Sequence, residues 1–271
     1  MNPSRCFERI RVVLHRPSHP GNIGAAARAM KTMGLSRLVL VEPRRFPDRD
    51  ADALAVNAAD LLAAAKICSS LKQALEGVAL AVAWSARGRD LSHAPLEARA
   101  AAAETLALAR TSEVALVFGN ETAGLANEEV LLCNRLAHIP TVPDFSSLNL
   151  AAAVQIVAYE IYLAAGAAAR AAQSQPSSKG EFSGRHEIDT RGEIYSKGEL
   201  ATIEQVEHFY AHLESSLGQT DFLEPGKPKR MMERMRRLFG RAGLQREEVN
   251  ILRGMLTAWD RKGRPERGGE S

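Results

Sequence analysis

Short apolar runs, many of them β-branched, alternate along residues 1–170 with stretches in which Ala and Leu recur at helical spacing. The pattern predicts strands at 9–14, 37–41, 66–68, 78–84, 113–118 and 136–139. It predicts helices at 23–33, 52–65, 71–76, 96–109, 127–133 and 148–168. Alternation of this kind indicates a parallel α/β sheet that is covered by helices on both faces.

The run 113–118, Glu-Val-Ala-Leu-Val-Phe, has the composition of a central, fully buried strand. It ends directly at Gly119. Loops at the carboxyl ends of parallel strands are where such sheets bind ligands. We therefore expect the loop after residue 118 to line a site.

The composition changes after residue 170. Gln-Ser-Gln-Pro-Ser-Ser-Lys-Gly occupies 173–180, with little apolar periodicity around it. Helical spacing returns beyond it in Leu200, Ile203, Val206, Tyr210, Leu213 and Leu217. We therefore expect a large domain at 1–170, a flexible linker at 171–198 and a small helical module at 199–271.

Basic residues are concentrated in one part of this module. The net charge is +3, yet the stretch 227–246 contains eight Lys and Arg and a single acid, Glu233. Such a concentration is the electrostatic footprint of a polyanion partner, although charge runs are more often solvated helix faces. The stretch is thus a candidate RNA contact, with Lys229, Arg230, Arg234 and Arg237 as its proposed members.

The cellular setting is inferred from weaker signals. The cysteines Cys6, Cys68 and Cys133 are far apart and odd in number, as expected for free thiols in a reducing cytoplasm. The N-terminus lacks the apolar run of a signal peptide. The Ala-rich run 151–172 is interrupted by polar residues, which argues against a membrane span.

The first candidate site segment is 19–30, between a strand and a helix. Gly21 and Gly24 permit close backbone approach, and Asn22 is a plausible N-cap of the helix. The helix N-terminus would suit an RNA phosphate, with Arg28 on the first or second turn. The spacing GxGxxG is absent, which disfavours a dinucleotide site. A glycine-containing turn with a surface arginine explains the same residues.

The second and third segments are 118–125 and 139–150. In the second, Glu121 is a lone carboxylate at the sheet end, and it could simply be an acid near the N-terminus of the next helix. In the third, Ser146 and Ser147 could be N-caps of the helix expected from Leu148. Capping leaves Asn149 inside a first turn without a structural reason.

Taken together and in this order, the three segments resemble the three motifs of the SPOUT superfamily of RNA methyltransferases, in its TrmH-like 2′-O-ribose branch. The resemblance covers roughly residues 8–168. Further segments are similar to the TrmJ group, which methylates the ribose at position 32 of the tRNA anticodon loop. They are Ser18–Gly24, Trp84–Arg87, Tyr159–Glu160, Phe209–Glu214, Arg236–Phe239 and Asn250–Gly254.

The resemblance implies an α/β fold whose C-terminal part forms a trefoil knot, with S-adenosylmethionine held in it by backbone groups of three loops. The matching residues here are Trp84, Ser85, Ala86, Gly119, Ile139, Ser146, Ser147 and Leu148. The family residue at position 84 is usually small. We expect the backbone of Trp84 to contact the cofactor, with its ring pointing away from the site.

The family's catalytic arginine and serine match Arg28 and Ser147. An arginine has a pKa above about 12, so it is a poor general base. We therefore expect Arg28 to clamp a phosphate and stabilise the developing alkoxide. Ser147 and Asn149 would orient the 2′-hydroxyl, and Glu121 would organise the motif loops. Asn22 would lie with Arg28 on the RNA side.

The resemblance also implies a homodimer in which Arg28 faces the partner's cofactor. No metal is expected, because His208 and His212 lack a convincing third ligand. Three alternatives stay open: methylation of another tRNA or rRNA site, a non-catalytic RNA-binding SPOUT protein, and a nicotinamide-dependent oxidoreductase.

Overall fold

The computed structural model describes residues 3–86, 95–173, 199–220, 222–223 and 228–262. Its centre is a parallel seven-stranded sheet in the order β3-β2-β1-β6-β4-β7-β5. The strands are β1 (Ile10–His15), β2 (Arg37–Val41), β3 (Lys66–Cys68), β4 (Leu80–Trp84), β5 (Leu96–Glu97), β6 (Val114–Phe118) and β7 (Arg135–His138). The predicted parallel α/β sheet is confirmed, with 113–118 as its central strand.

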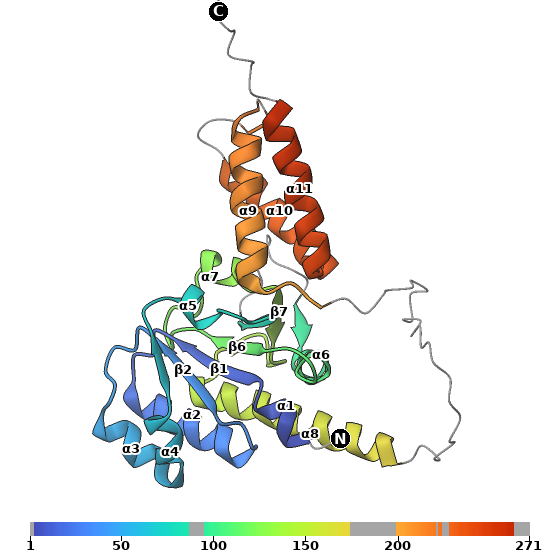
Figure 1. The fold of residues 1–271 in the computed structure, drawn as a ribbon. Coiled ribbons are helices and arrows are strands. Elements are labelled where there is room, and N and C mark those ends of the chain that lie inside the picture. The colour runs from blue at the N-terminus through green and yellow to red at the C-terminus, as the bar shows by residue number, and fades with distance from the viewer. Residues whose placement is uncertain (1–2, 87–94, 174–198, 221, 224–227, 263–271) are drawn as a thin grey trace, which may run out of the picture. The chain divides into compact units, whose positions relative to one another are not determined.

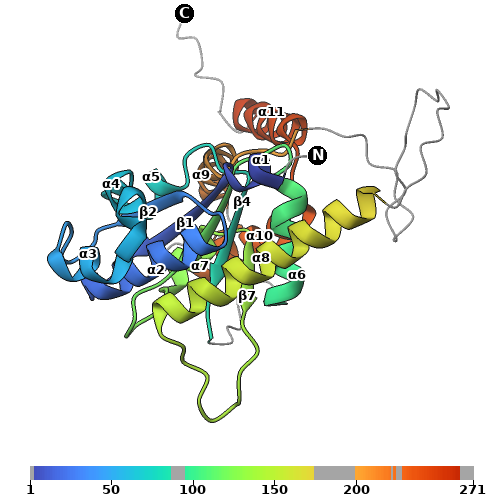
Figure 2. The same ribbon diagram turned by 90° about the horizontal axis from the view of Figure 1, so that it is seen from below.

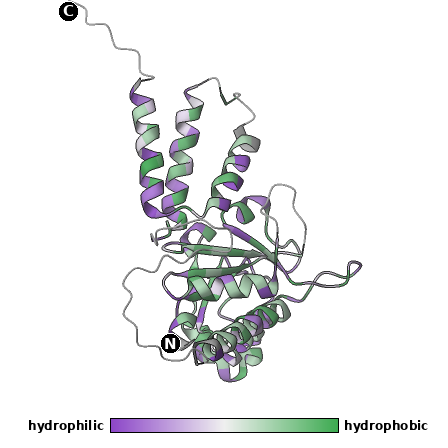
Figure 3. Ribbon diagram, turned by 90° about the vertical axis from the view of Figure 1, so that its right-hand side faces the viewer, coloured by the Kyte–Doolittle hydropathy of each residue, from purple (hydrophilic) through white to green (hydrophobic). Residues whose placement is uncertain are grey.

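Helices cover both faces of this sheet. They are α1 (Pro3–Phe7), α2 (Pro20–Thr32), α3 (Arg49–Ala55), the 3-10 turn η1 (Val56–Ala58), α4 (Ala59–Ala63), α5 (Leu71–Ala74), α6 (Ala98–Leu108), α7 (Asn127–Leu131) and α8 (Leu150–Gln173). In Figure 1, α2 and α8 lie on one side of the sheet, and α5 and α7 lie on the other. Every second residue of β1, β4 and β6 belongs to one core cluster, because alternate side chains of a strand point to the same face of the sheet. The strands are predominantly apolar in Figure 3.

The prediction of one continuous helix at 52–65 is wrong. The chain forms α3, η1 and α4 instead, and Val56 takes a left-handed φ of 52° between the first two. This breaks the helix beneath α2, where the backbones pass very close. A Cβ on Gly24 would lie 2.0 Å from the carbonyl oxygen of Ala51. Gly24 is thus required for helix packing.

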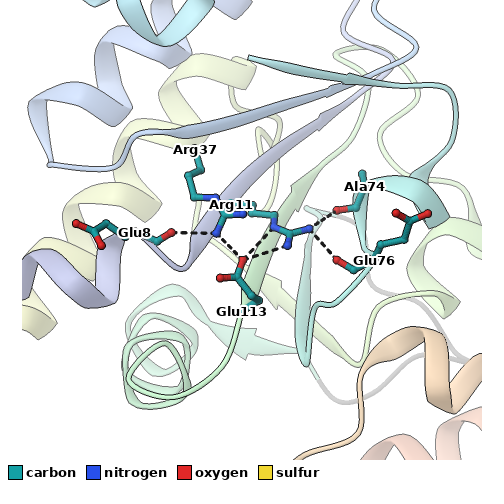
Figure 4. Close-up of polar contacts among 6 residues, drawn as sticks. All are labelled: Glu8, Arg11, Arg37, Ala74, Glu76 and Glu113. Carbon is teal, nitrogen blue, oxygen red and sulfur yellow. Dashed lines mark hydrogen bonds and ion pairs between the residues drawn. The ribbon is translucent and has the colours of Figure 1, made fainter. Parts of the chain in front are cut away.

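A cluster of charged side chains joins the amino-terminal ends of the strands (Figure 4). Glu113, immediately before β6, accepts hydrogen bonds from Nε and Nη2 of Arg11 on β1, at 3.2 and 3.1 Å. It also accepts one from Arg37 on β2. Arg11 Nη1 donates to the carbonyls of Ala74 and Glu76, so the cluster extends to the end of α5.

Residues 1–176 and 177–271 form two compact units. The second contains α9 (Ile203–Gly218), α10 (Pro228–Ala242) and α11 (Arg246–Lys262), which pack around a core with Phe209, Tyr210 and Met232. Arg236 lies over the ring of Tyr210, 4.5 Å from its centroid, and pairs with Glu207. This arginine of the basic stretch therefore has a packing role. The linker predicted at 171–198 falls largely outside the described residues.

The helix α8 corrects one expectation. Its residues 150–170 are long and apolar enough to cross a membrane by length and composition, contrary to the inference from their polar interruptions. In this structure α8 packs against α2 and α6. It buries Val154, Val157 and Ile161 in the core. Figure 2 shows α2 and α8 side by side on one face of the sheet.

Candidate active site at the carboxyl ends of the central strands

A cavity of about 200 Å³ opens where β4, β6 and β7 end. Its walls come from the loops after these three strands and from the start of α8. All eight residues predicted to bind a cofactor line it: Trp84, Ser85, Ala86, Gly119, Ile139, Ser146, Ser147 and Leu148. Glu121 lines it as well. The structure therefore brings together three segments that are far apart in the sequence.

Glu121 ties the loop after β6 to the start of α2. Its Oε2 accepts hydrogen bonds from the backbone N–H and the hydroxyl of Ser18, both at 2.8 Å. Its Oε1 accepts from the backbone N–H of His19 at 3.2 Å and from Nδ2 of Asn22 at 2.9 Å. The anion at the entrance of α2 is thus the chain's own carboxylate, in the position that the sequence suggested for an RNA phosphate.

These contacts keep Glu121 ionised. Burial by itself raises the pKa of the carboxyl, but the hydrogen bonds from Asn22 and Ser18 outweigh it and lower the pKa to about 2. Each of the donors stabilises the charged form. Among the residues that the structure describes, none of the groups that bond to Glu121 is a cation, so the carboxylate brings a negative charge to the cavity wall.

Asn22 links Glu121 to the start of α8. While its Nδ2 donates to Glu121, its Oδ1 accepts from Nδ2 of Asn149 at 2.9 Å. The N-cap expectation for Asn22 is wrong: His19 precedes α2, and Pro20 is its first residue. Pro suits that position because the first turn needs no N–H from it. A contact of Asn22 with RNA stays a prediction.

Asn149 has a structural role that the sequence did not reveal. Helix α8 begins at Leu150, and Oδ1 of Asn149 accepts from the backbone N–H groups of Ala151 and Ala152, at 2.9 and 3.3 Å. Asn149 is therefore the N-cap, and the capping role considered for Ser146 and Ser147 is wrong. Both serines precede the cap in a loop that projects from the sheet end in Figure 2. Capping thus leaves them unexplained, and they line the cavity.

Arg28 is exposed and does not line this cavity. It lies on the third turn of α2, and not on the first or second as expected. It is six residues beyond Asn22, about 9 Å further along the helix axis. Within the described part of the chain, no side-chain partner of Arg28 is found. Its guanidinium is available to a group outside the subunit.

Gly119 is required by the turn that follows β6. A Cβ here would lie 2.2 Å from the carbonyl carbon of Gly124. Asn120, which the sequence analysis missed, holds the turn: its Oδ1 accepts from the N–H groups of Thr122 and Ala123, and its Nδ2 donates to the carbonyl of Arg16. An asparagine after Gly119 could have signalled such an Asx turn.

Trp84 is buried and lies directly across from Phe118 in the sheet register. The two rings stack with centroids 5.9 Å apart and planes 8° from parallel. Both residues line the cavity. The indole Nε1–H is buried and finds no acceptor in the described structure. Leaving such a donor unmet costs about 1–3 kcal/mol.

A second cavity of about 420 Å³ lies on the β1 side of the same turn and shares Asn120 and Gly124 with the first. His15 and Glu129 meet there at 3.4 Å. Burial lowers the pKa of His15, while the nearby Glu129 carboxylate acts in the opposite direction. Sequence reasoning gave no signal for this pair.

Two of the four residues of the basic stretch that are predicted to contact RNA have described side chains. Arg234 and Arg237 are exposed on α10. The side chains of Lys229 and Arg230 lie outside the described part of the structure. His208 and His212, which were considered as metal ligands, lie on α9. His212 Nε2 is 3.0 Å from Oδ2 of Asp260 on α11.

Comparison with known proteins follows the same division of the chain. Residues 9–159 match the model of the SpoU rRNA methylase family. The chain belongs to the SpoU methylase family. Residues 204–268 match the C-terminal domain of the tRNA methyltransferase TrmJ. These two matches confirm the resemblance that was inferred from the motifs.

Relatives extend over nearly the whole length. A tRNA (cytidine/uridine/adenosine-2′-O-)-methyltransferase TrmJ of Pseudomonas aeruginosa is 48% identical over 93% of both chains. A tRNA (cytidine/uridine-2′-O-)-methyltransferase TrmJ of Pectobacterium atrosepticum is 43% identical over 93% of this chain and 97% of its own. The crystal structure of TrmJ from Z. mobilis matches with a TM-score of 0.74, at 28% identity and over 92% and 98% of the two chains.

Proposed function

We propose that this chain transfers the methyl group of S-adenosylmethionine to a ribose 2′-hydroxyl of tRNA, at position 32 of the anticodon loop. The observation that carries the proposal is the convergence of the segments 118–125 and 139–150 on one cavity, with the first segment tied to them by hydrogen bonds from His19 and Asn22, in a SpoU methylase chain. The tRNA substrate and the 2′-O chemistry agree with the names of the TrmJ relatives. Position 32 rests on the TrmJ resemblance.

The residues of the cavity fit this cofactor. Trp84 and Phe118 offer an aromatic wall, and Trp84 holds an unmet hydrogen-bond donor. Glu121 contributes a negative charge that favours a cationic ligand. When bound, S-adenosylmethionine supplies a methyl group that its sulfonium already activates. The chain therefore has to orient a ribose oxygen and accommodate the loss of its proton.

Ser147 and Arg28 would perform these tasks. Ser147 lines the cavity and would hold the 2′-hydroxyl by a hydrogen bond. Arg28 would bind the adjacent phosphate and stabilise the alkoxide as the proton leaves. Glu121, Asn22 and Asn149 would fix the relative positions of the loops, because their side chains form one hydrogen-bonded chain across them. Replacing Arg28 by Ala is expected to lower turnover about 100- to 1,000-fold.

The position of Arg28 supports a homodimer. Since this side chain lies outside its own cavity, we propose that it completes the partner's site. Helix α8 offers a surface for association, with Tyr159, Tyr162 and Leu163 exposed at 47%, 53% and 38%. The trefoil knot after β7 and a cytoplasmic location are proposed on the family resemblance.

Mixing two inactive variants tests the shared site. A heterodimer of Arg28→Ala and Ser147→Ala chains contains one intact site if Arg28 acts across the interface. Equal mixing with subunit exchange should then restore about one quarter of wild-type turnover. If Arg28 serves its own cavity, the mixture stays inactive. A monomeric mass at assay concentration would also contradict the proposal.

The second unit would dock the tRNA. Arg234 and Arg237 are exposed on α10, in the stretch of highest positive charge. Replacing both by Ala should weaken tRNA binding, with the salt slope falling by about one per lost phosphate contact. Arg253→Ala, at an exposed arginine of α11, is the matched control. Unchanged affinity in the double variant would make this stretch a solvated helix face.

The target position is tested in the cell. Ribose methylation is mapped in tRNA from a strain that lacks the gene, and then after complementation. Loss at position 32 alone supports the proposal. Loss at another tRNA or rRNA position would move the activity to a different substrate site, whereas an unchanged map would favour a non-catalytic RNA-binding role.

A further inference from the structure

Helix α11 of the second unit exposes a line of large apolar side chains. Ile251, Met255 and Trp259 are exposed at 63%, 63% and 55%. Each lies one helical turn beyond the last, so the three form a single strip along the helix. The core of the unit uses a different side of α11, to which Val249 and Leu256 belong. A continuous exposed apolar strip marks a contact surface.

The charges around this α11 strip argue against RNA as its partner. At about 100° per residue, Arg253 lies roughly 160° around the helix axis from Met255. The first turn contains the acids Glu247 and Glu248, and Glu248 lies almost in line with Met255, two turns before it. A phosphate backbone on the strip would meet these carboxylates instead of the arginine. A surface that is apolar in the middle and basic at one end is the better match.

A second copy of α11 offers this match when it runs in the opposite direction. The helix begins with two acids and ends with Arg261 and Lys262 in the sequence. If Met255 lies opposite its own copy, Ile251 of each helix lies opposite Trp259 of the other, because both are four residues from Met255. The acidic start of each helix then lies beside the basic end of the other. A parallel pair would put acid beside acid.

Small residues beside the strip leave room for a second helix. Gly254 and Ala258 are exposed next to Met255. A Cβ on Gly254 would meet nothing within 4 Å, so the packing of the unit itself does not require this glycine. Two helices in contact lie about 8–10 Å apart, and small residues at the contact favour the shorter distance.

We propose that the second units of two copies of this chain associate through an antiparallel pair of α11 helices, with Met255 on the two-fold axis. The contact is isologous, since each copy contributes the same surface. It is separate from the association through α8 proposed above. That association would hold two copies in one particle and raise the effective concentration of their second units.

Disulfide trapping in the full chain tests the register of the pair. The three native cysteines are buried, so a new cysteine on α11 is the reactive one. Only a residue on the two-fold axis meets its own copy, so Met255→Cys should form a covalent dimer under mild oxidation. Ile251→Cys and Trp259→Cys should each stay monomeric on a denaturing gel. The double variant with both cysteines should form the dimer.

Arg253→Cys, on the far side of α11, is the matched control and should form several-fold less dimer than Met255→Cys. Absence of the dimer in both Met255→Cys and the double variant would overturn the proposal. Equal amounts of dimer from every single cysteine, the control included, would do the same, since they indicate random collision. These measurements do not use methyl transfer, so they stand whether or not the proposed activity does.

A charge on the two-fold axis provides a second measurement. Met255→Glu brings two carboxylates together in the pair and should separate the helices, whereas Arg253→Glu should not. The fluorescence of Trp259 should then shift to longer wavelength and be quenched several-fold more strongly by acrylamide, because pairing shelters its indole. Trp84 is buried and contributes a constant background. Equal quenching of wild type and a folded Met255→Glu variant would contradict the pair.

Discussion

Two glutamates flank the central strand β6 and serve opposite purposes. Glu113, at the amino-terminal end, accepts hydrogen bonds from the guanidinium groups of Arg11 and Arg37. Glu121, beyond the carboxyl-terminal end, accepts from backbone N–H groups, a hydroxyl and an amide. The first carboxylate is neutralised by cations of neighbouring strands. The second keeps its negative charge at the cavity.

One strand thereby serves stability at its amino-terminal end and function at its carboxyl-terminal end. Cations from β1 and β2 hold the amino-terminal edge of the sheet together around Glu113 (Figure 4). Neutral donors hold Glu121 in place without cancelling its charge, so the loops are fixed and the carboxylate remains available for electrostatics. We therefore expect changes at Glu113 to alter folding, and changes at Glu121 to alter activity.

Among the changes that test this comparison, Glu121→Ala is expected to have the largest effect. Without the carboxylate, Ser18 and Asn22 lose their common acceptor, and the loops around the cavity lose their fixed relation. A displacement of about 1 Å at a reacting centre can cost about 100-fold, so kcat/KM for tRNA methylation should fall by about that factor. Steady-state kinetics with purified tRNA measures it. Kinetics within a factor of two of wild type would refute the positioning role.

Glu113→Ala should have the complementary effect. Arg11 would retain its bonds to Ala74 and Glu76 but lose its carboxylate partner. The side chains of Arg11, Arg37 and Glu113 are partly exposed. We therefore expect a loss of about 2 kcal/mol in the free energy of unfolding. Urea denaturation measures this loss. Turnover per folded molecule should stay at the wild-type value. A fall as large as that of Glu121→Ala would contradict the assignment of Glu113 to stability and Glu121 to activity.

The sequence predicted more of the sheet than of these side-chain contacts. Strand composition marked 113–118 as central, because a fully buried strand must be apolar throughout. By contrast, Glu113 meets Arg11 across more than one hundred residues of sequence, and Glu121 is equally far from Ser18. Local patterns contain no information on such pairs. The motif resemblance, and not periodicity, grouped Glu121 with the residues of the cavity.

The errors have the same origin. The break after α3 lies at Val56, which takes a φ of 52° in a segment that packs against α2. Such tertiary packing can override helix propensity. The sequence alone allows Ser146 or Ser147 as the cap of α8, because both precede the apolar run, and serine and asparagine are equally good caps. Only the backbone path distinguishes which residue stands at the helix start.

The low pKa of Glu121 should make the stability of the fold depend on pH in acid. A carboxyl whose pKa is lower in the folded chain stabilises the fold above its ordinary pKa of 4.5, and this contribution is lost as the pH falls toward about 2. Glu121→Gln should therefore reduce the pH dependence of unfolding between these values, with a difference of about 1 kcal/mol after solvent screening. Denaturation at several pH values measures it, and parallel curves for the two proteins would contradict the assignment.

The smallest effect tests the amide chain that joins Glu121 to α8. Asn149→Ser preserves a side chain that caps helices well but removes the donor to Asn22. The free energy of unfolding should change by less than about 0.5 kcal/mol, while turnover falls a few-fold because Asn22 is held at one end only. Asn149→Ala removes the cap as well and should cost about 1 kcal/mol more. If the serine variant turns over as fast as wild type, Asn149 acts through the helix start alone, and the hydrogen-bonded chain from Glu121 ends at Asn22.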